Sequence, residues 1–129
     1  MSQVHAIVWL DHREARVIGF SIGKKETIEV SSNREERRIH HKMKAIGSGK
    51  LADDHHFFDE IAAVLTDMQE VLIVGPGNAK TAFETYLLHR HADVGKRVVG
   101  RETLDHPSEG ELLAHARKYF EAHDQLGLR

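Results

Sequence analysis

EVLIVGPGNAKTAFETYLLHR, residues 70–90, is the stretch that decides the fold. Its residues 71–74 are continuously apolar and half β-branched, which is typical of a strand that is covered on both faces. The Gly-Pro-Gly of residues 75–77 ends that strand with a turn. The stretch therefore predicts a strand, a turn and an amphipathic helix. After the turn, apolar side chains recur at the spacing of one helix face, and we expect them to be buried: Ala79, Ala82, Phe83, Tyr86 and Leu87.

The start of this helix is also a candidate anion site. Asn78 can cap the helix by accepting a hydrogen bond from a free backbone amide, and a helix N-terminus attracts phosphate or carboxylate. A nucleotide-binding P-loop needs a second glycine directly before its Lys-Thr pair, and here that position is Ala79. Two interpretations stay open. The glycines either permit close packing only, or the turn is an anion or nucleotide sensor formed by Gly75, Gly77, Asn78 and Lys80.

The composition is that of one globular domain. The chain has 129 residues, of which 40% are hydrophobic and 29% charged, and we expect residues 1–129 to form a single domain. It has no cysteine, which excludes disulfides, thiolate metal sites and cysteine nucleophiles. No apolar run approaches the roughly 20 residues that span a bilayer, and the first residues lack the pattern of a secretory signal. We therefore expect a cytoplasmic protein without a membrane partner.

A basic segment is hidden by the formal net charge of −2. Residues 34–50, REERRIHHKMKAIGSGK, carry six basic and two acidic residues, a local charge of +4 that leaves −6 for the rest of the chain. Such a segment favours contact with a polyanion, because lysine and arginine neutralise phosphates. The alternative is a solvated loop whose charges only keep the protein soluble. If the segment binds a nucleic acid, RNA or DNA, the residues expected to contact it are Arg34, Arg37, Arg38, Lys42, Lys44, Gly47, Gly49 and Lys50.

The chain opens with a predicted β meander. Residues 4–10, 15–20 and 27–30 are three apolar-rich runs separated by short polar turns. Gly23 allows the backbone to reverse in the second turn. An edge strand of this meander could pair with a second copy of the chain, so a homodimer is possible.

The second half predicts alternating helices and strands. Helical spacing covers residues 57–65, with Asp53 or Asp54 near the helix start, and a strand follows at 97–100. Ser108 and Glu111 have the spacing of a capping box before a last helix. The order is βββ and then αβαβα, which predicts an α/β fold with a ribonuclease-H-like mixed sheet and helices on both faces. The connection at about 31–54 is too long for an ordinary link, which indicates a functional or partly disordered loop containing glycine.

Four segments resemble a known family. They are the helix at 57–65, VLIVGPGNAKTAFETYL at 71–87, RVVGRETLDHPSEGELLAHARKYF at 97–120, and the opening AIVWLDHREARVIGF at 6–20. The chain resembles the middle domain of the eukaryotic and archaeal class-1 release factors and of the ribosome-rescue factor pelota. It is also similar to short bacterial proteins labelled translational machinery proteins. The resemblance implies the ribosome or tRNA as a partner.

The chain departs from the release factors in the long connection. Release factors of that family place a Gly-Gly-Gln loop there, and its glutamine helps to position the water that hydrolyses peptidyl-tRNA. Here residues 46–51 read IGSGKL, without a glutamine. Lysine cannot replace an amide that both donates and accepts hydrogen bonds. We therefore expect a translation-associated RNA-binding module without peptide-release chemistry, with no catalytic residues and no cofactor.

An enzyme is the alternative. The histidine pairs at 40–41 and 55–56, with Asp53 and Asp54, could hold a divalent metal, although adjacent histidines point in different directions. A metal-dependent nuclease would need converging carboxylates, for which Asp11, Glu60 and Asp105 are candidates. The run Asp105-His106-Pro107-Ser108 contains the residue types of a hydrolase triad, but triad members meet in space rather than in sequence. The entry into the last helix accounts for this run equally well.

Overall fold

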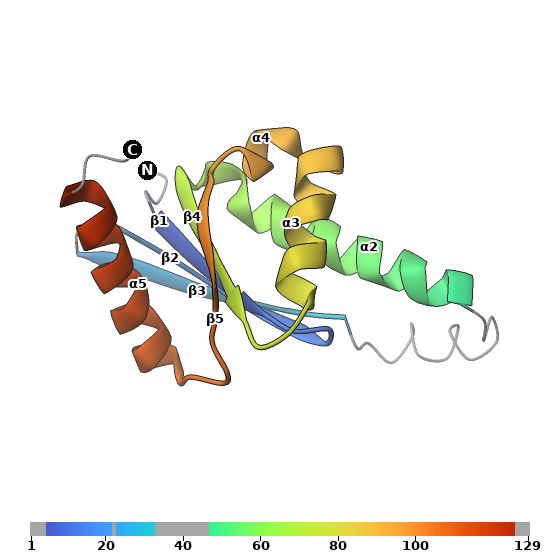
Figure 1. The fold of residues 1–129 in the computed structure, drawn as a ribbon, viewed down its shortest axis with the longest axis horizontal. Coiled ribbons are helices and arrows are strands. Elements are labelled where there is room, and N and C mark those ends of the chain that lie inside the picture. Colours follow the sequence, from blue (N-terminus) through green and yellow to red (C-terminus); the bar gives the residue numbers. More distant parts are fainter. Residues whose placement is uncertain (1–4, 22, 33–46, 126–129) are drawn as a thin grey trace.

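The computed structural model describes residues 5–21, 23–32 and 47–125, and only the backbone of residues 47–54, 124 and 125. Figure 1 shows a mixed sheet between helices that lie on its two faces. In the described part of the chain no helix is long and apolar enough to cross a membrane. The elements in chain order are β1 (His5–Leu10), β2 (Glu14–Ser21), β3 (Lys24–Ser31), α2 (Gly47–Val64), a 3-10 turn (Leu65–Asp67), β4 (Glu70–Gly75), α3 (Ala79–Arg90), α4 (Ala92–Gly95), β5 (Val98–Thr103) and α5 (Glu109–Gln125).

The sheet has five strands in the order β3-β2-β1-β4-β5. β2 pairs antiparallel with both β1 and β3, whereas β4 pairs parallel with both β1 and β5. Gly23 takes a positive φ of 74° in the β2–β3 turn, as the sequence predicted. The α/β fold with a ribonuclease-H-like mixed sheet is confirmed.

Two apolar layers hold the sheet between the helices. One face of β1 and β4 packs against α2, α3 and α4, and the other face packs against α5. Both strands are therefore buried on both sides, which explains their continuous apolar runs. Phe57, Phe83 and Leu87 are fully buried in the first layer, and Leu112, Ala116 and Phe120 are buried in the second.

Three local expectations were wrong. Helix α2 begins at Gly47, before the predicted start near Asp53 or Asp54, so its first turn contains Gly47, Gly49 and Lys50. Asn78 lies at the N-cap of α3, but its side chain makes no capping hydrogen bond because the residue itself is already in the αR conformation. Ala82 is exposed. The buried stripe of α3 is narrower than predicted.

Candidate functional site

The carboxyl ends of the parallel strands β1, β4 and β5 lie at one edge of the sheet, which we call the carboxyl edge. The β1–β2 turn, the β4–α3 turn and the β5–α5 loop all leave from it (Figure 1). A backbone hydrogen bond of 3.0 Å from Leu104 N to Gly75 O joins the β5–α5 loop to the end of β4. In open α/β sheets, ligands bind outside the carboxyl ends of the strands. A ligand site is therefore expected at the carboxyl edge.

Strand β3, which precedes the basic segment in the chain, ends at the carboxyl edge. Ser32 is the last described residue before that segment, and its hydroxyl donates to the carbonyls of His12 and Arg13, each at 3.1 Å. Ser32 N also donates to Arg13 O at 2.9 Å, so the end of β3 is fastened to the β1–β2 turn. Three predicted RNA-contacting residues, Gly47, Gly49 and Lys50, begin α2 instead of forming a loop. The others lie outside the described residues: Arg34, Arg37, Arg38, Lys42 and Lys44.

The predicted anion turn at the end of β4 is tightly built. A Cβ at Gly75 would collide with the carbonyl oxygen of Leu10, whereas a Cβ at Gly77 would meet nothing within 4 Å. Lys80 Nζ donates to Gly77 O at 2.7 Å, so its ammonium group closes onto the turn. The carbonyl oxygen of Asn78 accepts hydrogen bonds from the backbone N–H groups of Thr81 and Ala82 in the first turn of α3. The glycine at 75 has a packing role, and anion binding at this turn stays a prediction.

A polar groove lies beside this turn, between the β1–β2 turn and the β5–α5 loop. Two adjoining cavities of about 340 and 410 Å³ share one residue, His106, and we call them together the His106 groove. These volumes are in the range of small-ligand sites. The first cavity is lined by Asp11, Arg13, Glu14, Ser31 and His106, and the second by Trp9, Arg16, His106, Pro107, Ser108 and Glu111.

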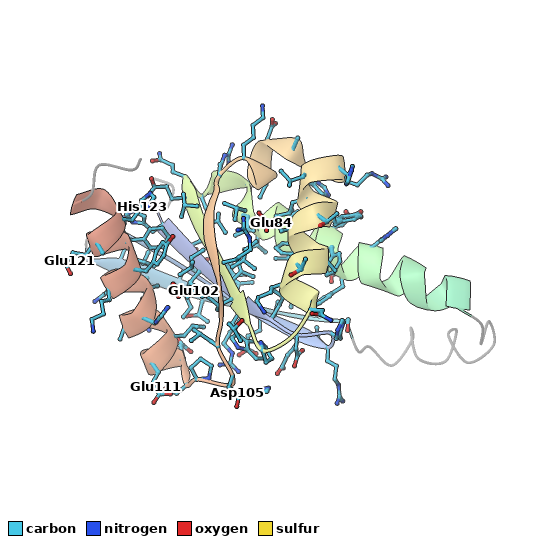
Figure 2. All side chains as sticks on the ribbon, in the orientation of Figure 1. Glu84, Glu102, Asp105, Glu111, Glu121 and His123 are labelled. Atoms are coloured by element: carbon cyan, nitrogen blue, oxygen red, sulfur yellow. The ribbon has the colours of Figure 1, made fainter. Side chains whose placement is uncertain are left out.

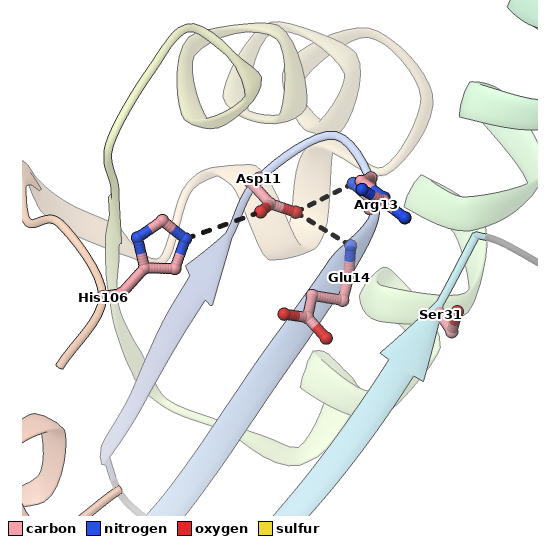
Figure 3. A pocket seen from close by; sticks show the side chains of 5 residues that line it. All are labelled: Asp11, Arg13, Glu14, Ser31 and His106. Atoms are coloured by element: carbon pink, nitrogen blue, oxygen red, sulfur yellow. Dashed lines mark hydrogen bonds and ion pairs between the residues drawn. The ribbon is translucent and has the colours of Figure 1, made fainter. Parts of the chain in front are cut away.

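Asp11 holds the β1–β2 turn and also faces the groove (Figure 3). Its Oδ1 accepts hydrogen bonds from the backbone N–H groups of Arg13 at 2.8 Å and Glu14 at 3.0 Å. Its Oδ2 faces His106 Nε2 across 4.0 Å. The first oxygen therefore fixes the turn, as expected of a hairpin residue, while the second remains directed at the groove.

His106 lies over the tryptophan that forms the floor of the groove. The ring centroids of Trp9 and His106 are 5.0 Å apart, and the Trp9 ring is almost completely buried. Trp9 Nε1 donates to Asp105 O at 2.7 Å across 96 positions of sequence, which fixes the β5–α5 loop. His106 Nδ1 lies 2.9 Å from Asp105 Oδ1, and its side chain is 63% exposed. The imidazole is thus held in position and remains largely exposed.

The start of α5 forms the far wall of the groove. Ser108 and Glu111 make the predicted capping box, with Ser108 N donating to Glu111 Oε1 at 2.9 Å and Glu111 N donating to Ser108 Oγ at 3.1 Å. Figure 2 shows Asp105 and Glu111 at this end of α5 and His123 at the other. Glu109 accepts hydrogen bonds from Thr27 and Lys25, which lower the pKa of its carboxyl. The helix start is therefore fixed independently of any ligand.

The carboxylates considered for a nuclease are divided between two faces of the sheet. Asp11 and Asp105 both flank His106, but Glu60 lies on α2, which packs on the face opposite α5. His56 Nε2 lies 3.9 Å from Glu60 Oε2, and His55 packs on Tyr86 with a ring distance of 4.9 Å. Among the described residues, no three His, Asp or Glu side chains are grouped to hold a metal. A nuclease or hydrolase stays an untested alternative.

Away from the groove, Asp59 connects α2 to α3 and to the residue that follows α3. Asp59 Oδ1 accepts from Tyr86 Oη at 2.6 Å and lies 2.8 Å from His91 Nε2. Burial alone would raise the pKa of Asp59, but the hydrogen bonds from His91 and Tyr86 outweigh burial and lower it. Burial and the bond to Asp59 raise the pKa of Tyr86. These contacts indicate a structural role for the cluster, which links α2 to α3.

A second polar cluster closes the opposite end of the sheet. Glu70 lies between two imidazoles, with His5 Nε2 at 3.0 Å and His123 Nε2 at 4.0 Å. The His5 ring packs 4.3 Å from Phe120, and His123 stacks on Tyr119 at 6.0 Å. These side chains join the ends of β1 and β4 to the last turns of α5. This cluster therefore packs the amino ends of β1 and β4 against α5.

Solved structures of known proteins share this fold. Pelota of Archaeoglobus fulgidus matches 92% of this chain, with a TM-score of 0.61 and 18% sequence identity, over 32% of its own length. Pelota of Thermoplasma acidophilum matches 84% of this chain, with a TM-score of 0.56 and 22% identity, over 30% of its length. The archaeal translation termination factor aRF1 matches 96% of this chain, with a TM-score of 0.57 and 16% identity, over 41% of its length.

The chain therefore spans about a third of the Pelota chains and about two-fifths of the termination factor. At these identities the likeness establishes a common fold. No protein-family model and no curated protein matches the sequence.

Sequence reasoning missed the His106 groove. It interpreted Asp11 as a hairpin residue and residues 105–108 as a helix entry, and both interpretations are correct locally. The groove exists because β1 and β5 bring these two segments to the same edge. The one available signal was Trp9, a large aromatic side chain at the end of β1 that needs a partner for its indole N–H.

Proposed function

We propose that this protein is a translation-associated binding module that contacts ribosomal RNA or tRNA through the basic segment, residues 34–50. The observation that carries the proposal is the fold match to a translation termination factor over 96% of this chain. A fold hosts many functions, so the match alone is an analogy. The local charge of +4 in a chain of net charge −2 supplies the chemistry that the analogy lacks.

The place of the basic segment in the fold supports this function. The segment joins β3 to α2, and the first turns of α2 extend beyond the sheet in Figure 1. Ser32, two residues before the segment, fastens the end of β3 to the β1–β2 turn. Ser32 and helix α2, which stand on either side of residues 33–46 in the chain, thus both belong to the scaffold.

The proposed mechanism is electrostatic capture without hydrolysis. Each phosphate that a lysine or arginine neutralises releases counterions, so affinity falls steeply as salt is raised. The sequence has no glutamine between residues 46 and 51 to position a hydrolytic water. We therefore assign binding and no peptide release to this module.

The test is co-sedimentation with ribosomes at about 50 mM salt, where phosphate contacts are strong. The variant replaces Arg37, Arg38, Lys42 and Lys44 together by glutamate. Each phosphate contact that is lost weakens binding, so we expect the fraction bound to fall at least about tenfold. Undiminished binding of this variant would overturn the proposal.

A matched control has the same charge change elsewhere. Lys24, Arg90, Lys96 and Lys118 are exposed residues outside the basic segment, and replacing all four by glutamate leaves the segment intact. We expect this control to retain most of its ribosome binding. Equal loss in both variants would show that net charge, rather than the basic segment, governs the contact.

A further inference from the structure

The His106 groove offers a mixed set of polar groups that the local structure only partly uses. Among the described residues, nothing pairs with the guanidinium of Arg13 or the carboxylate of Glu14, whereas Asp11 is partly engaged through its Oδ1. Arg13 and Glu14 are both exposed. The groove thus presents a free cation and a free anion within one small volume.

The acidic residues that line the His106 groove argue against a site for free phosphate. Asp11, Glu14 and Glu111 face Arg13 and Arg16, so the groove is not positively charged overall. Glu111 is engaged in the capping box, and Arg16 lies 5.9 Å above the Trp9 ring and 4.0 Å from Glu29. The groups left for a ligand are Asp11 Oδ2, Glu14, Arg13 and the exposed face of His106.

These groups complement one nucleotide of RNA. Carboxylates accept hydrogen bonds from hydroxyls, a guanidinium fork binds phosphate, and a flat imidazole face supports a base by stacking. The position fits as well, because Ser31 lines the groove and the basic segment starts just beyond Ser32.

We propose that the His106 groove takes a single ribonucleotide of the bound RNA. The carboxylate of Glu14 accepts from the ribose 2′-hydroxyl, Arg13 contacts the phosphate, and His106 stacks on the base. This inference rests on the proposed function, to which it adds a preference for ribose over deoxyribose, because only ribose has the 2′-hydroxyl that a carboxylate accepts from.

The single tryptophan of the chain reports on this groove directly. The experiment titrates the full-length protein with a short single-stranded RNA and with DNA of the same sequence, following Trp9 emission and, separately, the anisotropy of a labelled oligonucleotide. We expect RNA to change Trp9 emission and to bind about tenfold more tightly than DNA, the effect of one hydrogen bond to a charged group. Equal affinity for RNA and DNA would overturn the inference.

Variants locate the contact. Glu14→Gln should reduce the preference for RNA over DNA, and Arg13→Ala should weaken binding of both oligonucleotides about tenfold. Both residues are exposed, so the fold is expected to survive, and circular dichroism checks this. Lys118→Ala, an exposed substitution on α5 outside the groove, is the control. Unchanged RNA preference in Glu14→Gln would contradict the assignment.

The two proposals fail in different ways. If the basic-segment variant loses ribosomes while Trp9 emission never responds to RNA, the groove assignment is wrong and the proposed function stands. If ribosome binding is insensitive to the basic segment while Trp9 still discriminates RNA from DNA, the proposed function is wrong and the groove remains a nucleotide site.

Discussion

Two neighbouring connections at the carboxyl edge, the β4–α3 turn and the β5–α5 loop, differ in whether their polar side chains are available to a ligand. The β4–α3 turn has the glycines, lysine and helix start that a sequence reader associates with anions, but Lys80 donates to Gly77 O and the turn packs against the end of β1. The β5–α5 loop has no such pattern, yet His106 borders both cavities of the groove. The difference teaches that a turn becomes a site through the neighbours that surround it rather than through its own motif.

The largest expected effect tests whether the β4–α3 turn is a packing device. Gly75→Ala places a Cβ against the carbonyl oxygen of Leu10. Because strand backbone on both sides must shift, we expect a loss of about 3 kcal/mol in the free energy of unfolding, measured by urea denaturation. Gly77→Ala, with nothing within 4 Å of its added Cβ, is the matched control and should change stability by less than about 1 kcal/mol. If both variants lose a similar amount of unfolding free energy, Gly75 has no special packing role.

A smaller effect contrasts the helix starts that follow the two turns. Ser108→Ala removes the hydroxyl that caps α5, which should cost about 1 kcal/mol of unfolding free energy. Asn78→Ala at the start of α3 removes a side chain that makes no capping bond, so it should cost much less. Denaturation of both variants under identical conditions measures the contrast. A larger loss in Asn78→Ala would show that the motif at the β4–α3 turn caps its helix after all.

The smallest effect concerns pH and the anchoring of α3. The folded pKa of Asp59 lies below the ordinary unfolded value of about 3.9, so its contribution to stability is present above that pH and is lost as pH falls through the folded pKa. Its side chain is 49% exposed, so we expect only a few tenths of a kcal/mol after solvent screening. The measurement compares unfolding of the native chain and Asp59→Asn between pH 6 and pH 3. An equally steep pH dependence in both would exclude Asp59 as the source.

Elements whose cause is local were predicted well. The double-sided burial of β4, the reversal at Gly23 and the capping box of α5 each depend on residues that are close in sequence. The start of α2 was missed because the glycines at 47 and 49 are poor helix formers, and propensity alone favours a loop there. The sequence analysis expected Ala82 to be buried, but it is exposed. Helical spacing shows which residues share the apolar side of a helix, but it does not show how much of that side the rest of the protein covers.

The sequence by itself determined the order of strands and helices, the two apolar layers and the basic segment, because hydrophobic period, turn residues and charge are properties of neighbouring residues. Only the tertiary structure decided which of the connections at the carboxyl edge border the His106 groove. Asp11 and Trp9 meet Asp105 and His106 because parallel pairing places the ends of β1, β4 and β5 at one edge, and no local pattern encodes contacts between segments so far apart in the chain.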